Sequence, residues 1–420
     1  MHKWTKKVGL SLMIGAGFFL VAACGNSSEK SDAKGETLKV GVWGGNPSEE
    51  KSLDTLIANF EKETGAKVEK KVYTDYNTQI QADLVGKTAP DVFYVDASMY
   101  PFFAEQGALM ELDKDKIEAD KFYDKLNDAF STDGKQYAVP KDLSTLALYL
   151  NTDIFEKAGV SLDEIPASFE EYVQWLPQFQ AKIDAAYGEG KVFAMSYNPE
   201  LTRNMHIAQR NSTRVIAKDG LAELSNQKVL TNLSILPELV KTNAFVTPQD
   251  VGTGWNGEAF GAGKIAIMDE GNWVYQTLQD DYADINFEVK PMPTYKQEKG
   301  SMMFSVGWAK YAGTKQSDLA DKWIHYTTGK DGMQLWVEGT GTLPSRQDVA
   351  EAAKITDNPA LNVHLDAWEY ATVWQDGVTL TTVDSAYKNF IPKALDGSTS
   401  LEEAMKKADE QANTDIEAGK

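Results

Sequence analysis

Tryptophans beside glycine or asparagine are the residues of this sequence that best suit ligand binding. The 420-residue chain has ten tryptophans. Trp43, Trp255, Trp273 and Trp308 each adjoin a glycine or an asparagine at a predicted strand end or loop, and Trp374 lies in the segment TVWQDG. An indole face covers the apolar C–H face of a sugar ring, and nearby carboxylates and amides pair with the sugar hydroxyls. These positions therefore predict a carbohydrate-binding surface, and the alternative for each ring is packing in the core.

Motifs for catalysis are missing from the sequence. It has no GxxxxGK[ST] or GxGxxG phosphate loop and no GxSxG elbow. His206, His325 and His364 form no HExxH motif and no i, i+4 pair that would hold zinc. We therefore predict no metal ion, no cofactor and no enzymatic activity. A glycosidase is the alternative, because its carboxylate pair could come from any of the 62 acidic residues.

Three of the four arginines are clustered. Arg203, Arg210 and Arg214 fall in the segment LTRNMHIAQRNSTR of a chain that otherwise uses lysine. A guanidinium group pairs with a carboxylate or a phosphate through two parallel hydrogen bonds. The cluster is interpreted either as salt bridges within an acidic protein or as a site for an acidic sugar or a phosphodiester.

The overall charge excludes one class of partner. The formal net charge is -20, and nucleic-acid binding requires a basic face. We therefore predict a soluble, acidic protein with no nucleic-acid partner.

The N-terminal residues match a bacterial lipoprotein signal. Residues 1–7 carry three lysines, residues 8–23 are apolar and rich in small side chains, and Cys24 is the only cysteine. A span of about sixteen residues is short for a transmembrane helix, which is the alternative. We expect residues 1–23 to be removed, Cys24 to carry lipid that holds the protein on a membrane face, and residues 24–36 to form a flexible tether.

The elements that must position these side chains begin at residue 37. Residues 37–45, 66–74 and 90–96 read as strands, and residues 46–65 and 75–89 as helices, which predicts a parallel sheet covered by helices. Ligands bind beyond the carboxyl ends of such strands, which places one group of side chains at a common edge. These side chains are Trp43, Asp75, Tyr76, Asp96 and Ser98.

The rest of the chain shows a second set of strands. Residues 146–150 and 263–273 read as strands, and the span from Gly159 to about residue 243 reads as mostly helical. Two further strands are predicted in FEVKPMPT and FSVGWAKYAG, and the C-terminal portion is helical again.

Several segments in order resemble the extracytoplasmic solute-binding proteins of ATP-binding-cassette importers, in their oligosaccharide-binding, maltodextrin-binding-protein-like group (family 1). The segments are FEKETGAKVE, GKTAPDVFYVDASMYPFFAEQGALMEL, YAVPKDLSTLALYLNTDIFEKAG, FGAGKIAIMDEGNW, VKPMPT and GTGTLPSR. The chain differs from maltodextrin-type members at Val95-Asp96, where they carry an aromatic residue, and at Val306-Gly307-Trp308.

The resemblance implies an α/β, two-lobed periplasmic-binding-protein-like fold of type II. Each lobe has a mixed sheet flanked by helices, and hinge crossovers join the lobes. The expected first lobe comprises residues 37–143 and 308–350, and the expected second lobe comprises residues 144–307 and 351–420.

The resemblance also implies that the lobes close on a sugar, with Trp273 stacking on a ring and Asp142 and Ser144 flanking the hinge. Glu200 and Arg203 would supply a polar contact from the second lobe. The candidate ligand-binding residues from both lines of reasoning are Trp43, Asn46, Tyr76, Asp96, Ser98, Asp142, Ser144, Glu200, Arg203, Trp255, Trp273, Trp308 and Trp374.

The implied function is a monomeric, lipid-anchored binding protein on the extracellular face of the cell membrane, of the Gram-positive type. It would capture a carbohydrate, expected to be an oligosaccharide, and deliver it to the permease subunits of an importer. The alternatives are the same role for an anionic ligand, a cell-surface glycoside-active enzyme, and an adhesive surface protein.

Overall fold

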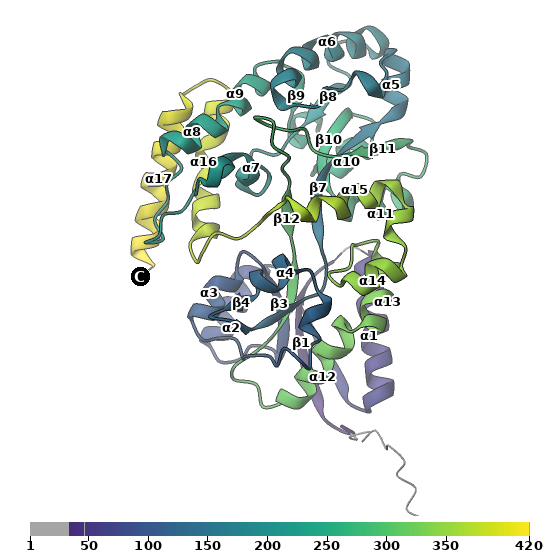
Figure 1. Ribbon diagram of the computed structural model, residues 1–420, viewed down its shortest axis with the longest axis vertical. Coiled ribbons are helices and arrows are strands. Elements are labelled where there is room, and N and C mark those ends of the chain that lie inside the picture. Colours follow the sequence, from purple (N-terminus) through teal and green to yellow (C-terminus); the bar gives the residue numbers. More distant parts are fainter. Residues whose placement is uncertain (1–32, 46, 420) are drawn as a thin grey trace, which may run out of the picture.

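The computed structural model describes residues 33–45 and 47–419 and shows two α/β lobes, one above the other in Figure 1. The sheet of the first lobe has the strand order β2-β1-β3-β13-β6. Strand β1 is parallel to both β2 and β3, which confirms the parallel sheet predicted from the sequence, and β13 is antiparallel to β3 and β6. The strands are β1 (Thr37–Trp43), β2 (Lys67–Tyr73), β3 (Val92–Asp96), β6 (Ala138–Pro140) and β13 (Val306–Lys310).

Helix α1 (Pro47–Thr64) shows why these residues fold against the sheet. Leu53, Leu56 and Phe60 recur at helical spacing and are buried, so one face of the helix is apolar. Phe60 meets Trp323 edge to face, with 5.2 Å between ring centroids. The other helices of this lobe are α2 (Tyr76–Val85), α3 (Tyr100–Glu105), α4 (Asp124–Ala129), α12 (Ser317–Thr328) and α13 (Lys330–Thr340).

The second lobe is built on a sheet of order β14-β12-β7-β10-β8-β9, and β11 also pairs with β7. Strand β7 (Ser144–Asn151) is buried throughout, as is β10 (Ile265–Gly271), which confirms both predicted strands. Strand β8 (Phe193–Ser196) interrupts the span read as helical, because four residues are too few to show a strand period. The remaining strands are β9 (Phe245–Val246), β11 (Phe287–Lys290), β12 (Met302–Phe304) and β14 (Thr372–Val373).

Helices enclose this second sheet, and two long C-terminal helices pack against each other along one side of the lobe (Figure 1). The helices are α5 (Thr152–Ala158), α6 (Phe169–Tyr187), α7 (Leu201–Ala208), α8 (Gln227–Leu233), α9 (Ile235–Val240), α10 (Asn256–Gly261), α11 (Trp273–Asp281), α15 (Pro359–Asp366), α16 (Leu380–Leu395) and α17 (Leu401–Ala418). Helix α14 (Gln347–Ala352) follows α13 at the junction of the lobes (Figure 1).

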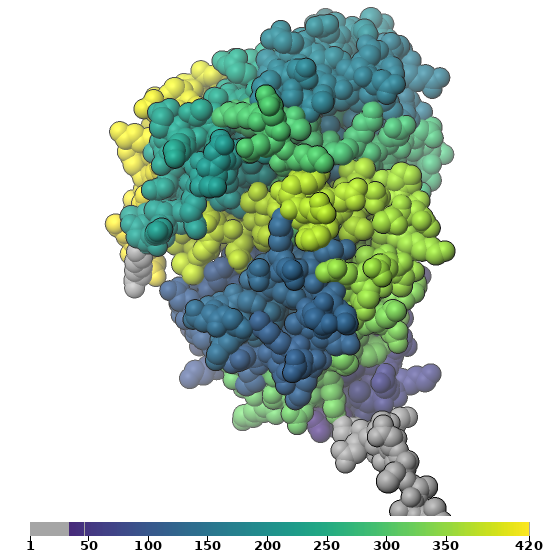
Figure 2. All heavy atoms as spheres, in the orientation of Figure 1, coloured from purple at the N-terminus to yellow at the C-terminus, as the bar shows by residue number. Residues whose placement is uncertain are grey.

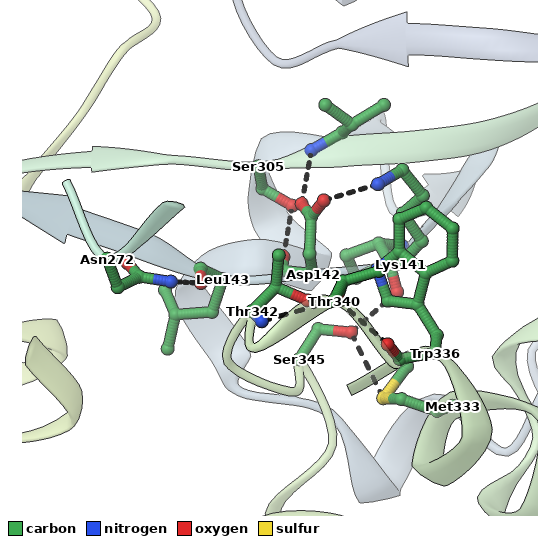
Figure 3. Close-up of polar contacts among 12 residues, drawn as sticks. Lys141, Asp142, Leu143, Asn272, Ser305, Met333, Trp336, Thr340, Thr342 and Ser345 are labelled. Carbon is green, nitrogen blue, oxygen red and sulfur yellow. Dashed lines mark hydrogen bonds and ion pairs between the residues drawn. The ribbon is translucent and has the colours of Figure 1, made fainter. Parts of the chain in front are cut away.

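Two of the crossovers between the lobes are hydrogen-bonded to each other (Figure 3). The Ser305 hydroxyl, between β12 and β13, donates to the carbonyl oxygen of Asp142, between β6 and β7, at 2.8 Å. The backbone N–H of Val306 donates to Asp142 Oδ1 at 3.0 Å. Val306 and Gly307 pair with β3 in the first sheet, so the second crossover lies at Ser305 and not at the predicted boundary before Trp308.

Among residues 33–45 and 47–419, no helix has the length and apolar character needed to cross a membrane. Residues 1–23 and Cys24, predicted to be the signal and the lipidation site, lie outside the described residues, as does most of the predicted tether 24–36.

Candidate functional site

A cleft of about 640 Å³ lies between the lobes and is lined by side chains from both. Its lining contains Trp43, Tyr76, Asp96 and Ser98 from the predicted edge of the first sheet, together with Trp374 of the second lobe. The structure therefore brings these five candidates together around one cleft. The other lining residues are Thr74, Asp75, Asn77, Met99, Thr202, Thr381, Asp384, Ser385 and Lys388.

Aromatic rings form part of the wall of the first lobe. Trp43 ends β1 and meets the ring of Tyr76 edge to face at 5.1 Å between centroids. Tyr76 begins α2, directly after the helix cap Asp75, and its hydroxyl donates to the backbone carbonyl of Tyr94. Burial raises the pKa of Tyr76 well above its usual value, so this phenol remains a neutral donor and anchors the wall.

Asp96 and Ser98 form a compact polar turn at the end of β3. Asp96 Oδ1 accepts hydrogen bonds from the backbone N–H of Ser98 at 2.8 Å and from its hydroxyl at 2.6 Å. Burial raises the pKa of Asp96, although the Ser98 hydrogen bonds act in the opposite direction. The turn therefore presents a fixed carboxyl group to the cleft beside the aromatic wall.

The wall of the second lobe is an ion-paired cluster on α7 and α16. The Lys388 ammonium lies 2.9 Å from Asp384 Oδ2 and 3.9 Å from Glu200 Oε1. Asp384 Oδ1 also accepts the backbone N–H of Leu201, the first residue of α7, at 3.2 Å. The candidate Glu200 accepts the Thr202 hydroxyl at 3.0 Å, so it supports this wall through residues that line the cleft.

Helix α16 also contributes to the cleft, and none of the predicted site residues lies on it. Thr381, Asp384, Ser385 and Lys388 all line the cleft, and they are spaced i, i+3, i+4 and i+7. That spacing puts them on one helix face. The sequence shows these four residues as a polar stripe at helical spacing, but such a stripe is equally typical of a solvated helix face.

Other candidates do not line this cleft. Trp308 is 2% exposed and packs on Tyr94 and Trp323 inside the first lobe, where it acts as a core residue. Trp255 is 38% exposed and covers Gly257 at the start of α10. Asp142 and Ser144 are buried at the first crossover, Asp142 in the hydrogen bonds described above. Asn46 lies outside the described residues.

Trp273 and Arg203 contact each other in the second lobe. Trp273 begins α11 rather than ending the strand, and it meets Phe304 edge to face at 5.6 Å. The guanidinium of Arg203 lies 5.6 Å from the centroid of the Trp273 ring and donates to Glu270 Oε1 at 2.8 Å. Neither Trp273 nor Arg203 is among the residues that line the cleft.

All three clustered arginines are engaged with protein groups. Arg203 pairs with Glu270, Arg210 pairs with Glu298 at 3.4 Å and donates to the carbonyl of Lys299 at 2.6 Å, and Arg214 pairs with Asp376. These contacts agree with the interpretation of the cluster as salt bridges within the protein.

A larger hollow of about 810 Å³ lies elsewhere, beside α12 of the first lobe. Its lining comes from one lobe and mixes lysines with aspartates without a Trp, Tyr or Phe ring, so it lacks the two-sided enclosure of the interlobe cleft. In the part of the chain that the structure describes, no group of three or more His, Cys, Asp or Glu side chains is placed to hold a metal ion.

Comparison with known proteins identifies the family. Residues 55–363 match the model of the bacterial extracellular solute-binding proteins. The chain is 25% identical to the diacetylchitobiose binding protein DasA of Streptomyces coelicolor over 78% of this chain and 79% of the relative. It is 22% identical to the maltodextrin-binding protein MdxE of Bacillus subtilis over 93% of each chain.

Solved structures show the same two-lobed fold. The ABC substrate-binding protein Lmo0181 from Listeria monocytogenes, in complex with cycloalternan, aligns with a TM-score of 0.76 at 20% identity over 91% of this chain and 99% of that chain. The GacH receptor of Streptomyces glaucescens aligns with a TM-score of 0.75 at 23% identity over 90% and 99%. DasA and MdxE are named as binding proteins, Lmo0181 as a substrate-binding protein and GacH as a receptor. Because the family match spans most of the chain, this protein belongs to the bacterial extracellular solute-binding proteins.

Proposed function

We propose that this protein captures a neutral oligosaccharide in the interlobe cleft and delivers it to the permease of an ATP-binding-cassette importer. The observation that carries the proposal is the lining of the cleft, in which the rings of Trp43, Tyr76 and Trp374 occur together with hydroxyl, amide and carboxyl groups. Aromatic faces suit the C–H faces of sugar rings, and the polar groups suit their hydroxyls.

The relatives support a carbohydrate ligand. One is named for diacetylchitobiose and another for maltodextrin, and the Listeria structure contains cycloalternan. These names differ in sugar and linkage, so the proposal for this chain is confined to the class of oligosaccharides.

The charges favour a neutral ligand over an anionic one. The described lining contains Asp75, Asp96 and Asp384 against one lysine, Lys388, which is ion-paired. Arg203, Arg210 and Arg214 have protein partners. A carboxylate or phosphate ligand would meet more negative than positive groups in the cleft.

The proposed mechanism is closure of two lobes around the ligand. Each lobe supplies part of the lining, so full contact requires both, and binding shifts an open–closed equilibrium toward the closed form. We further propose that the protein is a monomer, held at the extracellular face of the cell membrane by lipid on Cys24. At that membrane face the permease would recognise the closed form.

A thermal-shift screen of the purified protein tests the ligand class. A ligand that binds only the folded state raises the melting temperature. We expect a rise with neutral di- to tetrasaccharides and none with uronic acids, sialic acid or phosphodiesters. A rise confined to the acidic compounds would contradict the proposal. Product analysis after long incubation separates binding from hydrolysis, because a binding protein returns the oligosaccharide intact.

A further inference from the structure

Three consecutive residues connect the cleft to both lobes. Trp374 lines the cleft and is 6% exposed, and its backbone N–H donates to Met303 O at 2.8 Å, next to the second crossover. The next side chain, Gln375, points to the first lobe: its Nε2 donates to the carbonyls of Ala97 and Ala129, each at 2.7 Å.

The third residue of the group points to the second lobe. Asp376 is ion-paired with Arg214, and its Oδ2 accepts the side-chain amide of Gln209 at 2.9 Å. The Trp374 ring thus faces the cleft, the Gln375 amide faces the first lobe, and the Asp376 carboxylate faces the second lobe. In Figure 2 the yellow-green part of the chain, which includes α15, lies between the teal upper lobe and the blue lower lobe.

The carbonyl groups that Gln375 binds are next to the polar side of the site. Ala97 lies between Asp96 and Ser98, both of which line the cleft, and its N–H is bonded to Ser305 O at 3.1 Å. The hydrogen bond from Gln375 to Ala97 therefore connects the neighbour of Trp374, in the second lobe, to the Asp96–Ser98 turn of the first lobe.

A second donor, which belongs to the first lobe, adds to the connection between the lobes. Lys125 on α4 donates to the carbonyls of Trp368, at 3.0 Å, and of Glu369 and Ala371. Ala129 ends the same helix, so α4 is bonded to the 368–375 segment at both of its ends. Hydrogen bonds from a charged donor contribute more than neutral ones.

From these contacts we propose that Gln375 is a positioning residue, which fixes the Trp374 ring relative to the Asp96–Ser98 turn and so raises ligand affinity without touching the ligand. The proposal rests on the proposed function, in that Trp374 is taken as a ligand contact. Trp374, the residue before Gln375, is bonded to Met303 next to the second crossover. Lobes move least close to their hinge, so we expect the Gln375 hydrogen bonds to form in both the open and the closed protein.

A double-mutant cycle tests this role. Gln375→Met keeps the length of the side chain and removes both donors. We expect it to weaken binding of maltotriose or N,N′-diacetylchitobiose about tenfold by calorimetry, and to cause no further loss in a Trp374→Ala background. Equal losses in both backgrounds would show that Gln375 acts on binding independently of Trp374, and unchanged affinity would show a purely structural role; either result would overturn the proposal. The matched control is Gln178→Met, an exposed glutamine on α6 that also donates to a backbone carbonyl.

A measurement without ligand separates this proposal from the proposed function. In Gln375→Met, hydrogen exchange should become faster at the Trp374 and Ala97 amides, with the melting temperature close to that of the Gln178→Met control. Unchanged exchange at both amides would overturn the proposed role of Gln375. If no neutral oligosaccharide of the thermal-shift screen bound the wild-type protein, the proposed function would fail while the exchange result still decided the role of Gln375. Should Gln375→Met fold poorly, Lys125→Met provides the second variant, with the same two amides as the readout.

Discussion

Arg203 and Glu270 form a buried ion pair, with 2.8 Å between Nη2 and Oε1, although they lie 67 residues apart in the chain. The Glu270 side chain is 1% exposed and that of Arg203 is 12% exposed. This pair joins α7, which bears part of the cleft wall, to β10 at the centre of the second lobe.

Removing one partner of this pair should destabilise the protein. Arg203→Met leaves the Glu270 carboxylate buried without its partner, and we expect a loss of about 3–5 kcal/mol in the free energy of unfolding, measured by urea denaturation. The double variant Arg203→Met/Glu270→Gln should recover most of the loss, because the charge is removed as well. If the double variant were as unstable as the single one, the loss would come from packing and not from the unpaired charge.

Trp43→Ala should weaken sugar binding and Trp255→Ala should not. Trp43 lines the cleft, whereas Trp255 is an exposed tryptophan outside it and serves as the matched control. We expect a loss of about 1–3 kcal/mol of binding free energy for Trp43→Ala by calorimetry with the sugar identified in the screen. Equal losses for the two variants would remove Trp43 from the proposed site.

Asp142→Asn should lower stability through the crossover. Asp142 is paired with Lys141, whose side chain is 7% exposed, and accepts the N–H of Val306. Neutralising it leaves a buried ammonium group without a counter-charge, so we expect about 3 kcal/mol less stability in urea. Asp120→Asn is the control, because the Asp120 side chain is 73% exposed in its pair with Lys121, and such pairs contribute little. A loss no larger than that of the control would contradict this role of Asp142.

His364 should make stability fall on acidification. Its imidazole is fully buried, with Nδ1 2.8 Å from the carbonyl of Thr145 and Nε2 2.8 Å from the hydroxyl of Tyr149. Burial lowers its pKa from 6.5 to about 4, so on acidification the unfolded chain takes up the proton first. The contribution of His364 is therefore full above pH 6.5 and is lost as the pH falls from there to about 4, with a slope of about 1.4 kcal/mol per pH unit.

The slope can be assigned with one variant. His364→Gln should make the free energy of unfolding less dependent on pH in this window, measured by urea denaturation at several pH values. Other buried groups also titrate. The pKa of His206 is lowered to about 3 and acts in the same direction, whereas burial raises the pKa of Asp269 to about 7, and those of Asp96, Asp376 and Asp384 as well, which acts in the opposite direction. The control His325→Gln replaces an exposed histidine on α12. An unchanged slope in His364→Gln would show that His364 does not carry the dependence.

The sequence alone determined the three parallel strands β1, β2 and β3 of the first sheet and one edge of the cleft. Leu38, Val40 and Val42 alternate, and the apolar residues of α1 recur at helical spacing, so strand and helix could be told apart locally. The order of elements then predicted parallel strands, whose carboxyl ends share an edge. That rule places Trp43, Asp96 and Ser98 together from the sequence alone.

Only the tertiary structure decided which tryptophans face the cleft and what the arginines bind. Trp308 and Trp374 both lie in or beside short strands, yet helices and Tyr94 enclose the first while the second reaches the cleft. In a sheet covered on both faces, alternation does not mark an exposed side. The partners of Arg203, Arg210 and Arg214 lie 67, 88 and 162 residues away. Contacts across such separations depend on how complete elements pack, and local sequence patterns carry no information about them.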